Sequence, residues 1–151
     1  MTAFEDLAKK WTDAFNKHDA RAVAAHYAQD GVAYDPFYPE PLKGRAAIEK
    51  DAADFFRAFP DIRFELINLF DKGDRAAGEV KMTGTNSGPL ATPMGEVPAT
   101  GKRIDLRGAL VGRINAENLI VEERRYYDTG TMMKQLGLAP EVAEPVGVGA
   151  R

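Results

Sequence analysis

The stretch Leu119-Ile-Val-Glu-Glu-Arg-Arg-Tyr-Tyr-Asp128 carries four consecutive charged residues followed by two tyrosines. It predicts a strand, in which side chains alternate between two faces. Glu123, Arg125 and Tyr127 then share one face with Val121, and the opposite face is charged as well. Whichever face turns inward therefore buries charged side chains. A buried charge must be paired with an opposite charge or serve a function. The strand predicts either an internal ion pair or a functional site.

The composition is that of one globular domain. The chain has 151 residues, of which 44% are hydrophobic and 28% charged, and a chain of this length buries a full core. We expect a single domain over residues 1–138, without internal repeats. The tail, residues 139–151, contains two prolines and two glycines and is expected to be flexible or to lie on a partner.

Several classes of function are disfavoured by residue content. Cysteine is absent, which excludes disulfides and thiolate chemistry and fits a cytoplasmic protein. His18 and His26 have no further ligands at metal spacing, so neither a metal nor another cofactor is expected. The net charge is −3 without a basic cluster of note, so nucleic acid is not an expected partner. No apolar run of membrane-spanning length occurs, so no membrane association is expected.

Helical spacing of apolar residues predicts three N-terminal helices. The first starts at a Thr2 cap and ends near Phe15. The second is capped by Asp19, continues through Tyr27 and ends at Asp30-Gly31, before a short strand at 32–35. The third follows Gly44 to Phe59; its apolar side consists of Ile48, Ala52, Phe55 and Phe59.

After Pro60 the apolar period changes to two, which predicts strands. The expected strands are 62–70, 76–85, 102–114 and 119–127. Asp128 then caps a short helix that ends at Gly137. The segments 35–41 and 86–101 are rich in proline and glycine and are expected to be loops. The predicted fold is α+β, with three helices packed on one face of a curved antiparallel sheet.

Short motifs in this order point to a family. They are Trp11-Thr-Asp-Ala-Phe-Asn-Lys-His-Asp19, Tyr34-Asp-Pro36, Gly44-Arg-Ala-Ala-Ile48, Phe59-Pro-Asp61, Gly84-Thr-Asn-Ser-Gly88, Thr100-Gly-Lys102 and Gln135-Leu-Gly137. Together they resemble the cone-shaped nuclear transport factor 2-like superfamily, and within it the SnoaL-like polyketide cyclases. The resemblance implies a hydrophobic cone between helices and sheet, and it implies a homodimer.

The resemblance also implies which catalytic positions are kept. The aspartate that such cyclases and limonene epoxide hydrolases place on the last strand is Arg125 here, and Asn86 replaces a common histidine. Leu110 and Trp11 stand where ketosteroid isomerases carry oxyanion-binding groups. Asp35, before proline, matches the general base of those isomerases. The resemblance therefore supports the fold of this chain more strongly than it supports any one catalytic mechanism.

Two constellations are the candidate catalytic groups. Asp35 is the candidate base, and the alternative is an aspartate that anchors a turn before proline. Arg125 with Tyr127 is the candidate group for holding an enolate oxygen. The alternative for Arg125 is a structural ion pair with Glu123, or of Glu123 with Arg107. Asp128 is explained by helix capping.

The candidate substrate-binding residues are those expected to line the cone: Trp11, Phe15, Phe37, Phe55, Phe59, Asn86, Leu110 and Glu123. The aromatic members are also candidates for ordinary core packing, and Asn86 for a polar strand end that reaches solvent. The first hypothesis is a cofactor-independent cyclase, isomerase or lyase that removes a proton next to a carbonyl of a small apolar molecule. The others are a non-catalytic binding or accessory protein, and a dimerisation scaffold with a polar outer surface at Glu79, Lys81 and Thr83.

Overall fold

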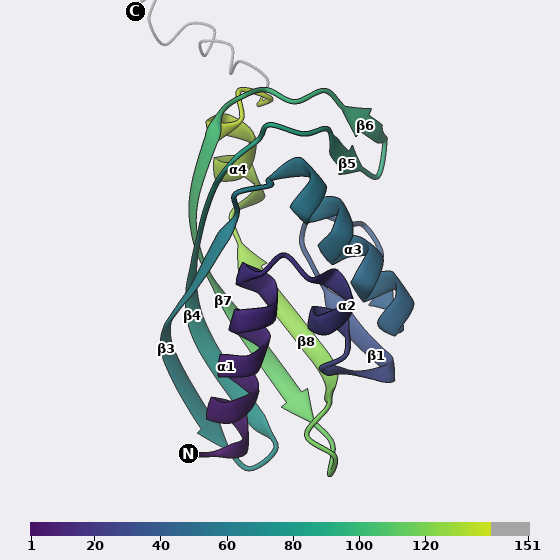
Figure 1. Cartoon of the computed structure of the whole chain (residues 1–151), viewed down its shortest axis with the longest axis vertical. Helices are drawn as coiled ribbons and strands as arrows, with labels where there is room; N and C mark the ends of the chain where they lie inside the picture. The colour runs from purple at the N-terminus through teal and green to yellow at the C-terminus, as the bar shows by residue number, and fades with distance from the viewer. Residues whose placement is uncertain (140–151) are drawn as a thin grey trace, which may run out of the picture.

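The computed structural model describes residues 1–139 (Figure 1). The expectation for the tail from residue 140 onward therefore lies outside the described residues. The helices are α1 (Ala3–Asn16), α2 (Ala20–Ala24), α3 (Arg45–Ala58) and α4 (Thr129–Gln135). The strands are β1 (Tyr27–Tyr34), β2 (Leu42–Lys43), β3 (Arg63–Lys72), β4 (Arg75–Thr85), β5 (Leu90–Thr92), β6 (Gly95–Val97), β7 (Arg103–Ile114) and β8 (Ile120–Tyr127).

Local capping rules explain where α1 and α4 begin. Thr2 accepts a hydrogen bond from the Glu5 N–H and the Glu5 carboxylate accepts one from the Thr2 N–H, which makes the predicted capping box. Asp128 accepts from the Gly130 N–H at the start of α4. Both predicted helix starts are confirmed.

The second helix is shorter than predicted. It ends at Ala24, and Tyr27 already belongs to β1, so the extension through Tyr27 and the stop at Asp30-Gly31 were wrong. Gly31 lies within β1, where an added Cβ atom would be 2.9 Å from the Ile120 carbonyl oxygen. The glycine is therefore required by close approach of β8, and not by a helix end.

The main sheet has the strand order β2-β1-β8-β7-β4-β3. β3, β4, β7 and β8 pair antiparallel as predicted, but β1 pairs parallel with β8. The α+β class and the four antiparallel strands are confirmed, and the sheet is mixed because β1 adds a parallel pairing that the sequence did not predict. The bulge in β1 between Tyr27 and Val32 interrupts its alternation, so the sequence indicated only the second part of this strand, from residue 32.

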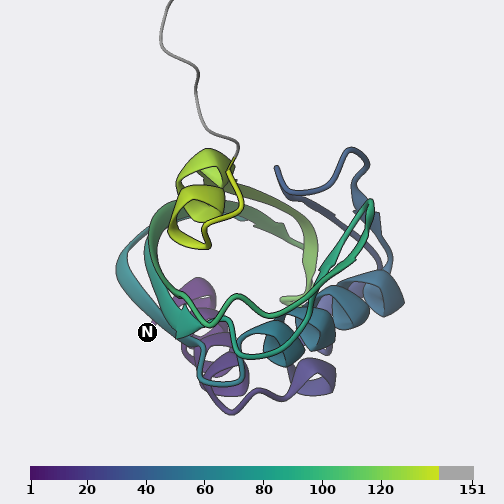
Figure 2. The ribbon, with the colours of Figure 1, turned by 90° about the horizontal axis from the view of Figure 1, so that it is seen from above.

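The sheet curls around a cavity that the helices close. Figure 2 shows the curved strands on one side, with α1 and α3 across the opening and α4 at the rim. The segment 86–101, predicted to be a loop, contains the hairpin β5–β6. An ion pair between Arg57 and Glu96, with an N–O distance of 3.0 Å, joins this hairpin to α3.

The core lies between the helices and the concave face of the sheet. On α3 the buried apolar residues include Ile48, Ala52 and Phe56. Phe55 is less buried than predicted because the helix turns its ring towards the cavity. Within residues 1–139, no helix is long and apolar enough to cross a membrane.

Candidate functional site

The inner face of β8 carries the predicted charged residues. Arg125 is opposite Leu110 on β7, Tyr127 is opposite Gly108 and Glu123 is opposite Gly112. The two glycines have no side chains that would compete with Tyr127 and Glu123 for the inner face. The alternation in the sequence thus brings these three polar groups to the concave side of the sheet.

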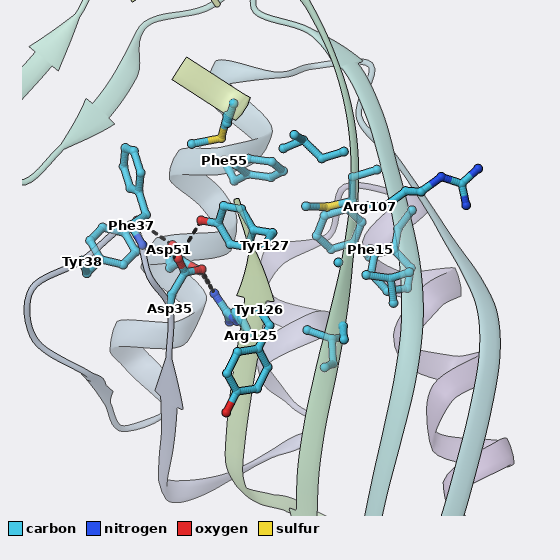
Figure 3. Close-up of a pocket in the computed structure, with 18 of the residues that line it drawn as sticks. Phe15, Asp35, Phe37, Tyr38, Asp51, Phe55, Arg107, Arg125, Tyr126 and Tyr127 are labelled. Atoms are coloured by element: carbon cyan, nitrogen blue, oxygen red, sulfur yellow. Dashed lines mark hydrogen bonds and ion pairs between the residues drawn. The ribbon is translucent and has the colours of Figure 1, made fainter. Parts of the chain in front are cut away.

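Arg125 is the centre of a buried ion cluster (Figure 3). Its Nε donates to Glu123 Oε1 at 2.6 Å. Its Nη1 donates to Asp35 Oδ2 at 3.0 Å and to Asp51 Oδ2 at 2.8 Å. The side chain of Arg125 is 16% exposed and that of Asp35 is 9% exposed. The predicted Glu123–Arg125 pair is confirmed, and it is part of a larger cluster.

Each carboxylate of the cluster also accepts a hydrogen bond from a tyrosine. Tyr127 Oη donates to Asp35 Oδ1 at 2.7 Å, Tyr38 Oη to Asp51 Oδ1 at 2.6 Å, and Tyr27 Oη to Glu123 Oε2 at 2.7 Å. The cluster thus has three carboxylates against one guanidinium. When all are ionised it is net negative. Such a buried network is stable only while each member keeps its partners.

The tyrosines stay protonated because of their surroundings. Burial raises the pKa of Tyr127 far above its ordinary value, and the negative Asp35 adds to the effect. Burial and Asp51 raise the pKa of Tyr38 in the same way. Burial alone would lower the pKa of Arg125, but the carboxylates around it, Glu123 first, raise that pKa well above its usual range. The hydroxyls therefore remain donors, and the guanidinium remains a cation.

One donor of the cluster stays available. Arg125 Nη2 has no hydrogen-bond partner within residues 1–139, although in this part of the chain every buried side-chain nitrogen has one. Nη2 therefore reaches accessible space. On the acceptor side, Asp35 Oδ1 already receives the Phe37 N–H at 2.9 Å and the Tyr127 hydroxyl. Asp35 Oδ2 receives only Arg125, so this oxygen can accept one more proton donor.

The cluster forms one wall of a cavity of about 120 Å³ between α1, α3 and the sheet. Asp35, Asp51, Arg125 and Tyr127 line it together. Its remaining walls are mostly apolar and aromatic, with contributions from Trp11, Phe15, Phe37, Phe55, Phe64, Val80, Met82, Leu106, Leu110 and Met132. An apolar cavity with a few converging polar groups is the usual form of a small-molecule site.

Five of the eight residues predicted to line the cone do so, and Phe59, Glu123 and Asn86 do not. Phe59 is fully buried and packs on the ring of Phe55, with ring centroids 4.9 Å apart. It belongs to the core because the helix ends at Ala58, which turns Phe59 away from the cavity. Glu123 lines a second cavity behind Arg125.

Asn86 is also placed away from the cavity. Its amide nitrogen donates to the carbonyls of Ala58 and Gly88, and its amide oxygen accepts from the Thr100 N–H and hydroxyl. The residue is fully buried. Asn86 is therefore neither a ligand contact nor a solvent-facing strand end: its bond to Ala58 holds the start of the 86–101 segment against α3, and its bonds to Gly88 and Thr100 join the two ends of that segment.

The sequence did not indicate Asp51, Tyr38 or Tyr27 as site residues. Asp51 is one helical turn before Phe55, and this i, i+4 spacing places both on the cavity side of α3. That spacing was the available signal. Tyr38 lies in the proline-rich loop 35–41, whose fold brings its hydroxyl to Asp51. Within residues 1–139, no three histidine or acidic side chains are arranged to hold a metal ion.

Comparisons with known proteins give a consistent family. The family model described as SnoaL-like polyketide cyclase matches residues 5–136. None of the curated proteins is similar enough in sequence to count as a match.

Solved structures share the fold. IdmH of Streptomyces antibioticus is 26% identical, with a TM-score of 0.69 over 88% of this chain and 97% of that one. TsrD of Streptomyces laurentii is 19% identical, with a TM-score of 0.76 over 90% and 96%. A protein of Catenulispora acidiphila with a ketosteroid isomerase-like fold, solved in complex with trimethylamine, is 19% identical, with a TM-score of 0.73 over 92% and 97%.

Proposed function

Because the chain belongs to the SnoaL-like polyketide cyclase family, we propose that it is a cofactor-independent cyclase or isomerase. Its substrate is an apolar small molecule with one or two carbonyl oxygens. The observation that carries the proposal is the pairing of the available Arg125 Nη2 donor with Asp35 in one apolar cavity. Proton abstraction next to a carbonyl needs a base on one side and a charge-stabilising donor on the other.

The first step is enolate formation. The substrate carbonyl oxygen accepts a hydrogen bond from Arg125 Nη2, and Asp35 Oδ2 takes a proton from the neighbouring carbon. The electron pair of the C–H bond becomes the carbon–carbon double bond of the enolate, and the carbonyl π electrons move to oxygen. The negative charge then lies against the guanidinium in a site of low dielectric constant, where it is strongly stabilised.

The second step returns the proton. In a cyclase, the enolate carbon attacks a second carbonyl of the same molecule, and the new alkoxide takes the proton from Asp35. In an isomerase, a different carbon of the enolate takes it. Tyr127 donates to Asp35, so it supports the base and is not the direct oxyanion donor that the sequence suggested. Both routes leave the protein unchanged and use no co-reactant.

Because position 125 on β8 is an arginine, the candidate acidic groups lie on other elements of the fold. The carboxylates come from the end of β1 and from α3, at Asp35 and Asp51, and the positive group comes from β8. Asp51 also lines the cavity, so it is the second carboxylate that a ligand can reach. Each of its oxygens accepts one hydrogen bond. It shares Arg125 Nη1 with Asp35 and keeps that donor fixed between them.

The test is Asp35→Asn with β-keto esters and enones as substrates. We expect exchange of the α-hydrogen in deuterated water, followed by NMR, to fall by about 100-fold or more. Asp13→Asn is the control, since Asp13 is exposed on α1. Exchange that persists in Asp35→Asn but is lost in Asp51→Asn would assign the base to Asp51. Exchange that persists in both would exclude both carboxylates.

A second candidate function is binding without turnover. The observation that favours it is that each carboxylate of the cluster is already paired with Arg125 and a tyrosine. Native mass spectrometry of the purified protein identifies any retained ligand. A ligand that stays bound and takes up no deuterium at its α-carbon supports the binding function.

A further inference from the structure

A second cavity lies behind the ion cluster, between α1 and the sheet. Its volume is about 100 Å³, and most of its walls are apolar, with Leu7, Leu66, Leu69 and Ile120 among them. Glu123 is its acidic group, and both Glu123 oxygens are already bonded, to Arg125 and Tyr27. The mechanism proposed above does not use this space.

Three side chains line both cavities and form the wall between them. They are Trp11 of α1, Phe64 of β3 and Leu110 of β7. The Trp11 ring meets Phe64 edge-on, with centroids 4.8 Å apart, and stacks on Phe15 at 5.1 Å. Its Nε1–H donates to Tyr27 Oη at 3.2 Å. Trp11 is thus held across the cone from one side, and Leu110 faces it from the sheet.

Trp11 and Leu110 are partly accessible although both point inward. Empty space on either side explains this accessibility, because a close-packed wall would leave none. The two volumes are similar, so removal of the wall would nearly double the space open to a ligand. Leu110 is also the direct strand neighbour of Arg125, so the wall begins next to the group proposed to hold the carbonyl oxygen.

We propose that Trp11, with Leu110, is the specificity-determining wall that limits the length of the substrate. The second cavity is an apolar subsite that this wall separates from the reacting centre. It takes an alkyl or aryl arm attached to an oxygen-bearing head at Arg125 once the wall is reduced. This inference rests on the proposed function for the ligand class, and on the shared lining residues for the wall.

The experiment uses 2-alkylcyclohexane-1,3-diones, from methyl to decyl, whose enolised ring resembles the proposed intermediate. Dissociation constants are measured by calorimetry. In the wild type we expect affinity to rise by about fourfold for each added methylene until the first cavity is full, and then to stop rising. In Trp11→Ala and in Leu110→Ala the rise continues to longer chains, although the short members bind more weakly than to the wild type because both side chains also line the first cavity.

The variants separate the wall from general loosening. Val23→Ala is the control, because Val23 is 2% exposed and lines neither cavity; it should keep the wild-type chain-length limit. Trp11→Ala and Leu110→Ala each remove one side of the wall, from α1 and from β7. If only one of the two variants folds, it is enough for the test. An unchanged chain-length limit in a folded wall variant overturns the inference about the wall and leaves the proposed function standing. Failure of every diketone to bind to any of the proteins overturns the ligand class, and with it the subsite.

Discussion

At the scale of single residues, Arg125 decides the character of the site. Three carboxylates and one guanidinium lie in a largely buried cluster, and the desolvation of such charges is offset only by mutual pairing. The arginine therefore has two roles in our proposal. It holds the carboxylates together through Nε and Nη1, and it offers Nη2 to the substrate.

Arg125→Gln should destabilise the protein strongly. Removal of the shared cation leaves the buried carboxylates of Asp35, Asp51 and Glu123 facing one another, and loss of one partner of a buried pair costs about 3–5 kcal/mol. Urea denaturation measures the free energy of unfolding. The control is Arg124→Gln on the other face of β8, whose partner Glu122 is partly exposed; it should cost less than about 1 kcal/mol. Equal losses in the two variants would contradict the structural role of the cluster.

Tyr127→Phe should reduce the rate more than the affinity. The change removes the hydroxyl that holds Asp35 Oδ1, while the Phe37 N–H remains. A hydrogen bond to a charged group contributes about 1.5–3 kcal/mol, so we expect about a tenfold to hundredfold lower kcat with KM nearly unchanged. Tyr38→Phe, which removes the corresponding bond to Asp51, is the comparison. A Tyr127→Phe variant with the wild-type kcat would remove this tyrosine from the mechanism.

The pKa of Tyr127 gives this prediction a pH signature. Since burial and Asp35 raise that pKa above its usual value, the hydroxyl stays protonated at pH values where a free tyrosine ionises. The rate of the wild type should therefore show no decline through ionisation of Tyr127 up to about pH 10.

Residue-level prediction from sequence succeeded where periodicity applies. The period of two in β8 indicated that Glu123, Arg125 and Tyr127 share a face, and they do. Asp51 was missed because a single acidic residue on an amphipathic helix looks like an exposed one. Asn86 was misjudged because three of its four bonds reach Ala58 and Thr100, which are distant in sequence, and no local pattern reports such contacts.

At the scale of elements, the pairing of β7 with β8 depends on glycine at one position. At Gly108 an added Cβ atom would be 2.5 Å from the Tyr126 carbonyl oxygen on β8. Gly112 has the same inward orientation four residues later, yet its Cβ atom would have Glu122 O, at 3.8 Å, as its nearest neighbour. The two glycines therefore differ in how much space the backbone leaves.

Gly108→Ala should separate the strands and lower the free energy of unfolding by about 1–3 kcal/mol. Gly112→Ala should change it by less than about 1 kcal/mol. Thermal and urea denaturation of the pair give the comparison, with hydrogen exchange at Tyr126 and Tyr127 as the local readout. Equal stability of the two variants would show that β7 and β8 can shift to accept the methyl group.

The order of elements was largely predictable, and the place of β1 was not. Turn residues and the change of period located β3, β4, β7 and β8, because each is long and alternates. β1 lies far along the chain from β8, pairs with it in parallel and contains a bulge. Parallel pairing across a long crossover leaves no turn signal in the sequence.

At the scale of the whole molecule, the outer face of the sheet carries a few exposed apolar residues among its charged ones. Val111 is 36% exposed and Tyr126 54% exposed. The register places Val111 opposite Ala77 of β4, and Tyr126 opposite Ala109 of β7. The polar surface predicted at Glu79, Lys81 and Thr83 continues onto β7, where Arg107 is opposite Lys81 and Asp105 is opposite Thr83. Arg124 covers the ring of Tyr34 at 4.3 Å beside it. A patch of this kind on the convex side is typical of an interaction surface.

We expect two copies of the chain to associate through this outer face, since the cavity opens on the concave side and stays free. Sedimentation velocity at micromolar concentrations should give a dimer. Val111→Lys and Tyr126→Lys should each give a monomer, because a dimer would bury the new ammonium groups close to Arg124, which has the same charge. Met94→Lys is the control: Met94 is 99% exposed and lies in the turn of the β5–β6 hairpin, outside the main sheet. A wild-type monomer would contradict the expectation, and a dimer in both patch variants would place the interface elsewhere.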